Sequence, residues 1–121
     1  MGKFLIRETA SGVKFDLLAA NGQVILLSEV YTSRAAALKG IASIRQNATA
    51  ARVENQTEEG CRILPHPKFE LYRDRAGEYR FRLKARNGKI VGISESYATK
   101  TGALNGIESV KTNAAQAETE G

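Results

Sequence analysis

One long internal repeat constrains this chain more than any other sequence feature. The segment Asn21 to Asn47, NGQVILLSEVYTSRAAALKGIASIRQN, returns without a gap as Asn87 to Asn113, NGKIVGISESYATKTGALNGIESVKTN. Asn-Gly, Ser-Glu-x-Tyr and Ala-Leu-x-Gly-Ile-x-Ser recur in register in the two copies. Self-similarity of this kind predicts that one supersecondary unit is built twice. The repeat therefore indicates an architecture, although it indicates no chemistry.

The length of the chain, 121 residues, suits one compact unit or two very small ones. Each copy has only about 50 to 60 residues, which is near the lower limit for burying a sufficient core alone. We therefore expect the two copies to share a core and to fold as one unit. The expected division is a first repeat at residues 1–56, a linker at 57–67 and a second repeat at 68–121.

Alternation of apolar and polar residues predicts three strands in each copy. In the second strand of the first copy, Val13, Phe15 and Leu17 fall on one face, as in a half-buried antiparallel strand. Asn21-Gly22 follows, and both residues can hold the positive φ that a two-residue type I′ turn requires. The strands expected from this pattern are residues 3–8, 13–20 and 23–27 in the first copy and 68–73, 79–85 and 89–93 in the second.

A helix is expected after the third strand of each copy. In the first copy Thr32 or Ser33 is the expected N-cap, because a hydroxyl oxygen can accept a hydrogen bond from a backbone N–H of the first turn. Apolar residues at helical spacing extend this helix to about Gln46, and Asn47 is expected to cap its end in a left-handed conformation.

The second helix and the last strands follow the same pattern. Thr99 or Thr101 is the expected N-cap of the second helix. Arg52 to Gln56 is interpreted as a short strand after the first helix. The tail from Ala114 to Gly121 either forms the matching last strand or frays.

The order strand, strand-Asn-Gly-strand, Ser-Glu-x-Tyr, then a helix with Gly-Ile-x-Ser, resembles the YegP-like family of small bacterial proteins of unknown function. The resemblance covers both repeats and most of the chain. It implies an α+β fold of tandem β-β-β-α-β repeats, which form one pseudo-two-fold-symmetric antiparallel sheet with two helices on one face. It also implies that the repeats exchange their last strands, and it implies no activity. The stretch Gly60 to Pro67 is longer than the usual join.

The corner between the third strand and the helix carries the repeated Ser-Glu-x-Tyr motif. Two sites, or one shared cleft, are one interpretation of these corners. A structural role is favoured, because corner residues commonly serve turns and caps. In that role Ser and Glu bond the helix N-terminus, and the Tyr ring closes the core with its hydroxyl outward. The residues concerned are Ser28, Glu29 and Tyr31 in one copy and Ser94, Glu95 and Tyr97 in the other.

A glycine lies on or beside the apolar stripe of each expected helix, at Gly40 and Gly106. Glycine in a helix interior costs about 1 kcal/mol relative to alanine. Its presence in both copies indicates a close approach of the helix to the sheet, or of one helix to the other. A groove for a ligand is the functional alternative, and packing is favoured over it.

Positive charge is concentrated in one strand of the second copy. The net charge is +5, and residues 79–89 contain basic residues but no acidic residue. Alternation places most of these cations on one exposed side of the strand, where an aromatic ring can lie beside them. A solubilising face is the favoured interpretation, and a weak, sequence-tolerant site for single-stranded RNA or DNA is the alternative. The candidate polyanion-binding set is Arg80, Arg82, Lys84, Arg86 and Tyr72.

No group of residues in the sequence has a pattern typical of an enzyme or a metal site. The single cysteine, Cys61, and the single histidine, His66, share a Pro-containing linker, which rarely holds a nucleophilic pair in place. One Cys and one His cannot build a closed zinc site of the Cys/His type in one chain. No Gly-rich phosphate loop precedes a helix. We expect no enzyme activity, no cofactor and no metal.

The remaining expectations concern compartment and partners. A lone cysteine permits no intramolecular disulfide, and the N-terminal apolar run is too short for a signal peptide or a membrane span. We expect a cytoplasmic protein without membrane contact, either a monomer or a weak dimer. The favoured function is a non-enzymatic binding or protein-interaction module with a protein partner, and weak nucleic-acid binding is the alternative.

Overall fold

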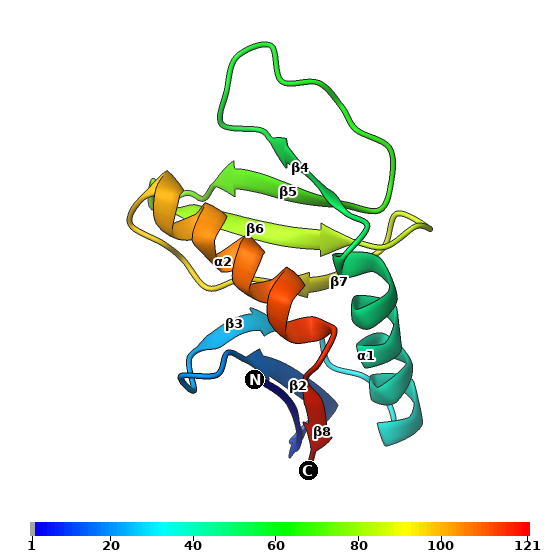
Figure 1. Cartoon of the computed structure of the whole chain (residues 1–121). Coiled ribbons are helices and arrows are strands. Elements are labelled where there is room, and N and C mark those ends of the chain that lie inside the picture. Colours follow the sequence, from blue (N-terminus) through cyan, green and yellow to red (C-terminus); the bar gives the residue numbers. More distant parts are fainter. Residues whose placement is uncertain (1) are drawn as a thin grey trace.

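The computed structural model describes residues 2–121 as a single mixed sheet with two helices (Figure 1). The strands lie in the order β4-β5-β6-β7-β3-β2-β1-β8. Neither helix in this described part is long and apolar enough to cross a membrane. The elements are β1 (Lys3–Thr9), β2 (Gly12–Leu18), β3 (Val24–Leu27), α1 (Arg34–Ala48), β4 (Arg52–Asn55), β5 (Lys68–Arg73), β6 (Tyr79–Lys84), β7 (Ile90–Ile93), α2 (Lys100–Ala114) and β8 (Glu118–Glu120).

Each half of the chain sends its last strand to the sheet of the other half. β4 follows α1 but pairs with β5, and β8 follows α2 but pairs with β1. This is the exchange that the family resemblance implies, and the tail from Ala114 therefore ends in a strand rather than fraying. The strands from β5 to β1 in this order are antiparallel as expected, but both edge strands run parallel to their neighbours. No hairpin joins either edge pair: a long crossover at 56–67 separates β4 from β5.

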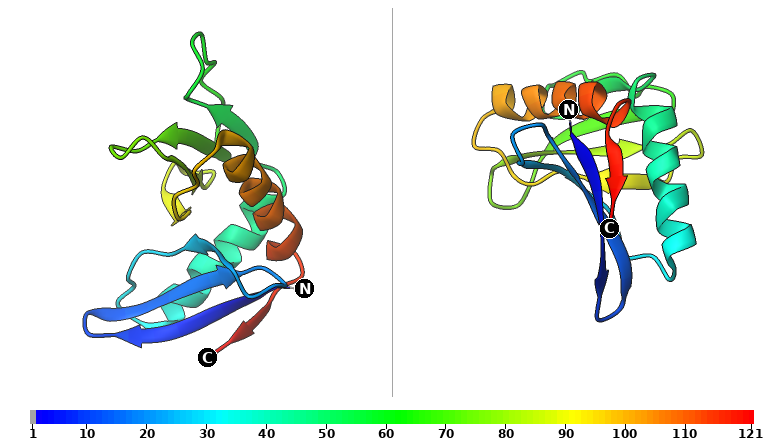
Figure 2. Two further views of the ribbon diagram at one scale, coloured as in Figure 1. Left: turned by 90° about the vertical axis from the view of Figure 1, so that its left-hand side faces the viewer. Right: turned by 60° about the horizontal axis from the view of Figure 1, so that its bottom comes forward.

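The hydrophobic core lies between the sheet and the helices and contains residues of both copies. α1 packs on β2, β6 and β7, and α2 packs on β1, β2, β3, β5 and β6, so each helix covers both halves of the sheet (Figure 2). The other face of the sheet carries no helix. The mixed core is the physical basis for expecting one folding unit. Its largest fully buried apolar side chains are Phe4, Phe15, Leu17, Leu26, Ile44, Phe69, Leu71, Phe81, Leu83, Ile107 and Val110.

The turn at Asn21-Gly22 differs from the type I′ turn that was expected. Gly22 has a φ of 86°, whereas no non-glycine residue in the described chain has a positive φ. The Gly22 N–H donates to Ala19 O over 2.9 Å, and the Ala19 N–H donates to Gln23 O over 2.8 Å. This is a three-residue loop that ends in a G1 bulge. It needs only one left-handed residue, and glycine takes that conformation without steric cost.

Each helix is capped by one of the two N-cap residues that were expected for it, Ser33 for α1 and Thr99 for α2. The side chains of Ser33 and Thr99 accept hydrogen bonds from the third backbone N–H beyond them. The expected left-handed cap at Asn47 is wrong, because Asn47 lies inside α1, which continues to Ala48. Its Nδ2 donates to Ser43 O over 2.7 Å, and its Oδ1 accepts a hydrogen bond from the Arg86 N–H over 3.2 Å. Asn47 thus connects α1 to the second half.

Candidate binding surfaces

The repeated corner serines bond the sheet rather than the helix N-terminus. Ser28 Oγ accepts a hydrogen bond from the Phe15 N–H over 2.9 Å and donates to Glu29 O over 2.7 Å. Ser94 makes the same two bonds, with Phe81 N–H and Glu95 O, at 2.9 and 2.8 Å. The expectation of helix capping by the motif is therefore wrong, because Ser33 and Thr99 cap the helices. The serine hydroxyl instead forms a hydrogen bond between the residue that follows one strand and the backbone of the neighbouring strand.

The corner tyrosines close the core against the helix glycines. The ring of Tyr31 stacks on Phe15 with centroids 6.0 Å apart, and its hydroxyl reaches the backbone at Gly40. Tyr97 makes the corresponding stack on Phe81 at 6.1 Å and reaches Gly106. Burial, and then the nearby charge of Glu29 or Glu95, raises the pKa of Tyr31 and of Tyr97 above its ordinary value of 10.0. These glycines mark a close contact with a tyrosine ring.

The basic residues of β6 are brought together on the helix-free face, where each forms an ion pair with a carboxylate. Arg80 Nε lies 3.0 Å from Asp74 Oδ2. Arg82 Nε lies 2.6 Å from Glu70 Oε1, and Lys84 Nζ lies 3.2 Å from Glu70 Oε2. These three residues lie on one face of the sheet as expected, but they are ion-paired, and Arg82 and Lys84 share the single carboxylate of Glu70.

Two further members of the candidate set have different surroundings. Tyr72 lies beside the row as expected, and its ring centroid is 4.6 Å from the guanidinium carbon of Arg82. Arg86 lies beyond the end of β6, where it is exposed and its backbone contacts Asn47. The structure thus brings Tyr72 to the row and leaves Arg86 apart from it.

Sequence reasoning missed the acidic partners, although the hairpin contains the signal. Pairing β5 with β6 in register places Glu70 directly opposite Arg82. Lys68 and Glu70 are two residues apart along β5, so both side chains face the same side of the sheet as the basic row. Counting back from the turn after Arg73 would have found this arrangement.

A buried ion-pair network continues from this row to the edge strand. Lys68 Nζ lies 2.7 Å from Glu54 Oε1 and 3.3 Å from Glu70 Oε2. Glu54 also accepts hydrogen bonds from Gln56 Nε2 and from the Leu64 N–H, each over 2.7 Å. Burial alone would raise the pKa of Glu54. These hydrogen bonds and the charge of Lys68 lower it by a larger amount, so the pKa of Glu54 is about 2. The network holds the linker against the sheet.

The linker residues Cys61 and His66 have separate neighbours. The ring of His66 lies over Gly88 in the β6–β7 turn. Cys61 Sγ lies 3.6 Å from the carbonyl oxygen of the adjacent Arg62.

The helix-free face is hollowed where the two halves meet. β3 and β7 are joined through the pair Leu27 and Ile93, and a hollow of about 400 Å³ lies beside this pair. Two apolar side chains remain partly exposed there: Ile90 at 39% and Ile93 at 36%. Lys14 and Arg80 line the hollow from opposite halves. The junction hollow, lined by Lys14, Leu27, Ser28, Glu29, Arg80, Ile90, Gly92 and Ile93, is the first candidate binding surface.

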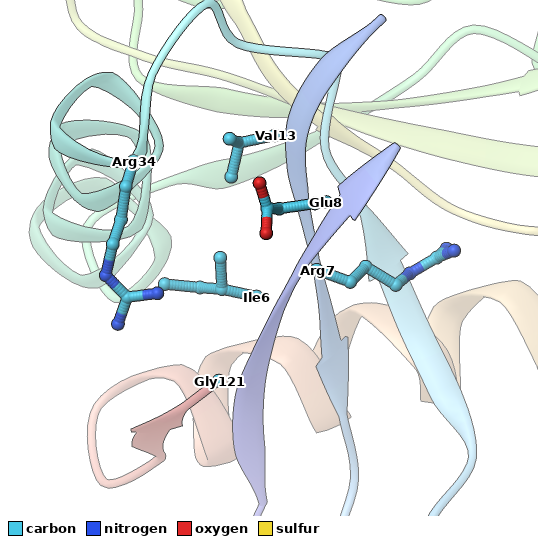
Figure 3. Close-up of a pocket in the computed structure, with 6 residues that line it drawn as sticks. All are labelled: Ile6, Arg7, Glu8, Val13, Arg34 and Gly121. Atoms are coloured by element: carbon cyan, nitrogen blue, oxygen red, sulfur yellow. The ribbon is translucent and has the colours of Figure 1, made fainter. Parts of the chain in front are cut away.

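A second hollow, of about 450 Å³, lies between β1 and the first turn of α1. Figure 3 shows the side chains of Ile6, Glu8 and Arg34 turned toward this space, whereas Arg7 points away. Arg7 instead pairs with Asp16 at 3.1 Å. The β1–α1 hollow is lined by Ile6, Arg7, Glu8, Val13, Arg34 and Gly121.

Comparison with known proteins gives the same fold and no activity. The family described as a domain of unknown function (DUF1508) matches residues 9–54 and 74–120. UPF0339 protein YegP of Yersinia pestis is 39% identical over 114 residues, which are 93% of this chain and 88% of that protein. UPF0339 protein MS1092 of Mannheimia succiniciproducens is 44% identical over 101 residues, which are 84% of this chain and 76% of that protein.

Two solution NMR structures have the same fold. That of YegP from Escherichia coli, described as a protein of unknown function, has a TM-score of 0.77 at 36% identity and covers 98% of this chain and 90% of its own. That of UPF0339 protein SO3888 from Shewanella oneidensis has a TM-score of 0.78 at 29% identity, with coverage of 98% and 89%. The resemblance inferred from the repeat is therefore confirmed, and the chain belongs to the YegP-like DUF1508 family, whose function is unknown.

Proposed function

We propose that this protein is a non-enzymatic protein-interaction module that binds through the junction hollow. The observation that carries the proposal is the exposure of Ile90 and Ile93 in the centre of the helix-free face, beside a hollow of about 400 Å³. An apolar centre with a charged rim is the usual anatomy of an interaction surface. Most other large apolar side chains of the sheet lie under the helices.

The charges around the junction hollow favour a particular partner. Lys14 has no ion-pair partner among residues 2–121, and Arg80 approaches the hollow from the other half. Glu29 contributes one negative charge at the rim. A partner segment that places an apolar side chain between Lys14 and Arg80, and an acidic group beside Lys14, fits this pattern. Electrostatic complementarity of this kind mainly supplies specificity and association rate.

Exposed apolar residues at two places allow a matched test of this proposal. Ile90→Thr/Ile93→Thr removes the apolar surface while keeping two β-branched side chains that suit a strand. Leu38→Gln removes an equally exposed apolar side chain from α1, outside the hollow. We expect the immobilised wild type and the Leu38→Gln variant to retain partner proteins. The Ile90→Thr/Ile93→Thr variant should not retain them. Equal retention by all three proteins would contradict the proposal.

Weak nucleic-acid binding through β6 remains the alternative function. Its support is limited to Arg86 and Lys89, which are exposed and make no ion pair with any residue from 2 to 121. The other cations of the strand bind carboxylates, so a phosphate would have to compete with Glu70 and Asp74. The protein-interaction proposal is therefore preferred.

A further inference from the structure

The linker between β4 and β5 presents one apolar side chain almost entirely to solvent. Ile63 is 87% exposed, whereas the other exposed large apolar side chains of residues 2–121 are at most 46% exposed. The linker leaves the sheet at the β4 edge and projects beyond it (Figure 1). An apolar side chain in this position adds nothing to the core, and it gains free energy only by burial against another surface.

The backbone next to Ile63 is held in place. The Leu64 N–H donates to Glu54 Oε1 over 2.7 Å, and Glu54 is buried and paired with Lys68. Pro65 follows directly, and its ring restricts the conformation of Leu64. A side chain on a fixed backbone loses less conformational entropy on binding than one on a flexible loop. Ile63 is therefore a preorganised apolar knob at the edge of the molecule.

Ile63 cannot reach the junction hollow of its own chain. The neighbouring Leu64 is held at β4, whereas the hollow lies at the junction of β3 and β7, and β5 and β6 lie between. Neighbouring strands are about 4.8 Å apart, so β4 and β7 are separated by about 14 Å. An isoleucine side chain is much shorter than this distance. Only the linker of a second copy can place Ile63 in the hollow.

The charges of the linker complement those at the rim of the hollow. Lys14 and Glu29 line the hollow and make no ion pair with any residue from 2 to 121. Arg62 and Glu59 lie just before Ile63, are exposed and make no ion pair in the same range. With Ile63 on the apolar floor, Arg62 suits Glu29 and Glu59 suits Lys14. Complementarity of this kind favours one partner over others.

We propose that the linker of one copy of this chain binds the junction hollow of a second copy, with Ile63 on its apolar floor. The inference rests on the proposed function, because it takes the junction hollow to be an interaction surface, and it names a second copy as the partner. Each copy carries both the knob and the hollow, so two copies that exchange linkers form a closed dimer. Because a single loop buries little area, the association is weak and reversible.

The single cysteine provides the probe. A nitroxide spin label is attached to Cys61, two residues before Ile63, in chains without ¹⁵N. These chains are mixed at millimolar concentration with ¹⁵N-labelled chains that carry Cys61→Ser, so only contacts between copies broaden the observed amide signals. Broadening is expected at residues 14, 27–29 and 90–93. The matched control carries the spin label on α1, as Leu38→Cys in a Cys61→Ser chain, and should leave these signals sharp.

Variants on each side of the contact test its specificity. Ile63→Ser in the spin-labelled chain is expected to remove the broadening, and it leaves the core intact because Ile63 is exposed. Glu29→Arg in the ¹⁵N-labelled chain should weaken the association about fivefold, the most that an exposed ion pair usually contributes. Arg62→Glu in the spin-labelled chain should then restore it, as a direct pair requires.

Sharp signals for the hollow at millimolar concentration, unchanged broadening with Ile63→Ser, or no restoration by the charge exchange would each overturn the inference. The retention experiment distinguishes this failure from that of the proposed function. If Ile90→Thr/Ile93→Thr abolishes the retention of other proteins but no broadening occurs between copies, the inference alone fails. Equal retention by all three proteins, together with no broadening, would remove the proposed function as well.

Discussion

The hydroxyl group of Tyr31 occupies the space that a side-chain Cβ at Gly40 would need. The ring cannot withdraw freely, because it stacks on Phe15, and Phe15 Cε2 also lies only 3.2 Å from that position. The repeated glycine of the helix and the repeated tyrosine of the corner are therefore two parts of one contact, and Tyr97 and Gly106 repeat it.

Replacement of this glycine should destabilise the fold despite a gain in helix propensity. Gly40→Ala is expected to lower the free energy of unfolding by roughly 1–3 kcal/mol through overpacking. Tyr31→Phe in the same chain should recover part of that loss, because it removes the overlapping hydroxyl. Urea titration measures both effects, with the exposed helix substitution Asn105→Ala as a control. A more stable Gly40→Ala protein would show that the contact is not tight.

The corner serine should carry a measurable share of stability. Ser94→Ala leaves the buried Phe81 N–H without its side-chain acceptor, and an unsatisfied buried donor costs about 1–3 kcal/mol. Ser96→Ala, in the same corner but exposed, is expected to change stability by less than about 0.5 kcal/mol. Thermal unfolding of the two variants compares them, and equal midpoints would argue against the hydrogen-bond role.

Acid should release the linker network. The folded pKa of Glu54, about 2, lies below its ordinary value of 4.5. Glu54 therefore contributes stability above about pH 4.5, and this contribution is lost progressively as the pH falls toward 2. Glu54→Gln should cost about 2 kcal/mol at neutral pH, because a hydrogen bond to a charged group is lost. It should also flatten the pH dependence of the unfolding free energy between pH 4.5 and 2, and an unchanged slope would contradict this role.

The basic row should affect stability more than nucleic-acid binding. Arg82→Gln removes one of the three cations that pair with buried Glu70, and the loss of this charged hydrogen bond is expected to cost about 1.5–3 kcal/mol. Lys89→Gln, at an exposed position of the following hairpin, should cost little. Fluorescence titration of a labelled single-stranded oligonucleotide should show no saturable binding at physiological salt. Tight binding that Arg82→Gln removes without unfolding the protein would restore the nucleic-acid interpretation.

Neither half should form a stable monomer alone. Residues 1–56 would retain β4 without β5, and residues 57–121 would retain β8 without β1. Both halves would also expose core residues that the partner half covers. Expressed separately, each is expected to give poorly dispersed amide NMR spectra or to self-associate. A well-dispersed monomer of either half would show that the core is not shared.

The sequence by itself determined the elements, the duplication and the family. Strand alternation, helical spacing and the gapless repeat are local signals, and they located β5, the strand after α1 and both N-caps within one or two residues. They also indicated that Gly40 and Gly106 mark close packing. These features depend on residues near one another in the chain, so a linear pattern records them.

Tertiary structure decided the rest, because it depends on which distant groups meet. The G1 bulge at Gly22 and the position of Asn47 inside α1 follow from strand register and from a bond to Arg86. The charge of β6 could be counted in the sequence, but its pairing with carboxylates depends on Glu70 and Asp74 lying beside it in the folded protein. The surroundings of the two helix starts also differ: Glu58 Oε2 of the linker lies 3.9 Å from Lys100 Nζ, whereas Val13 and Arg34 line a hollow.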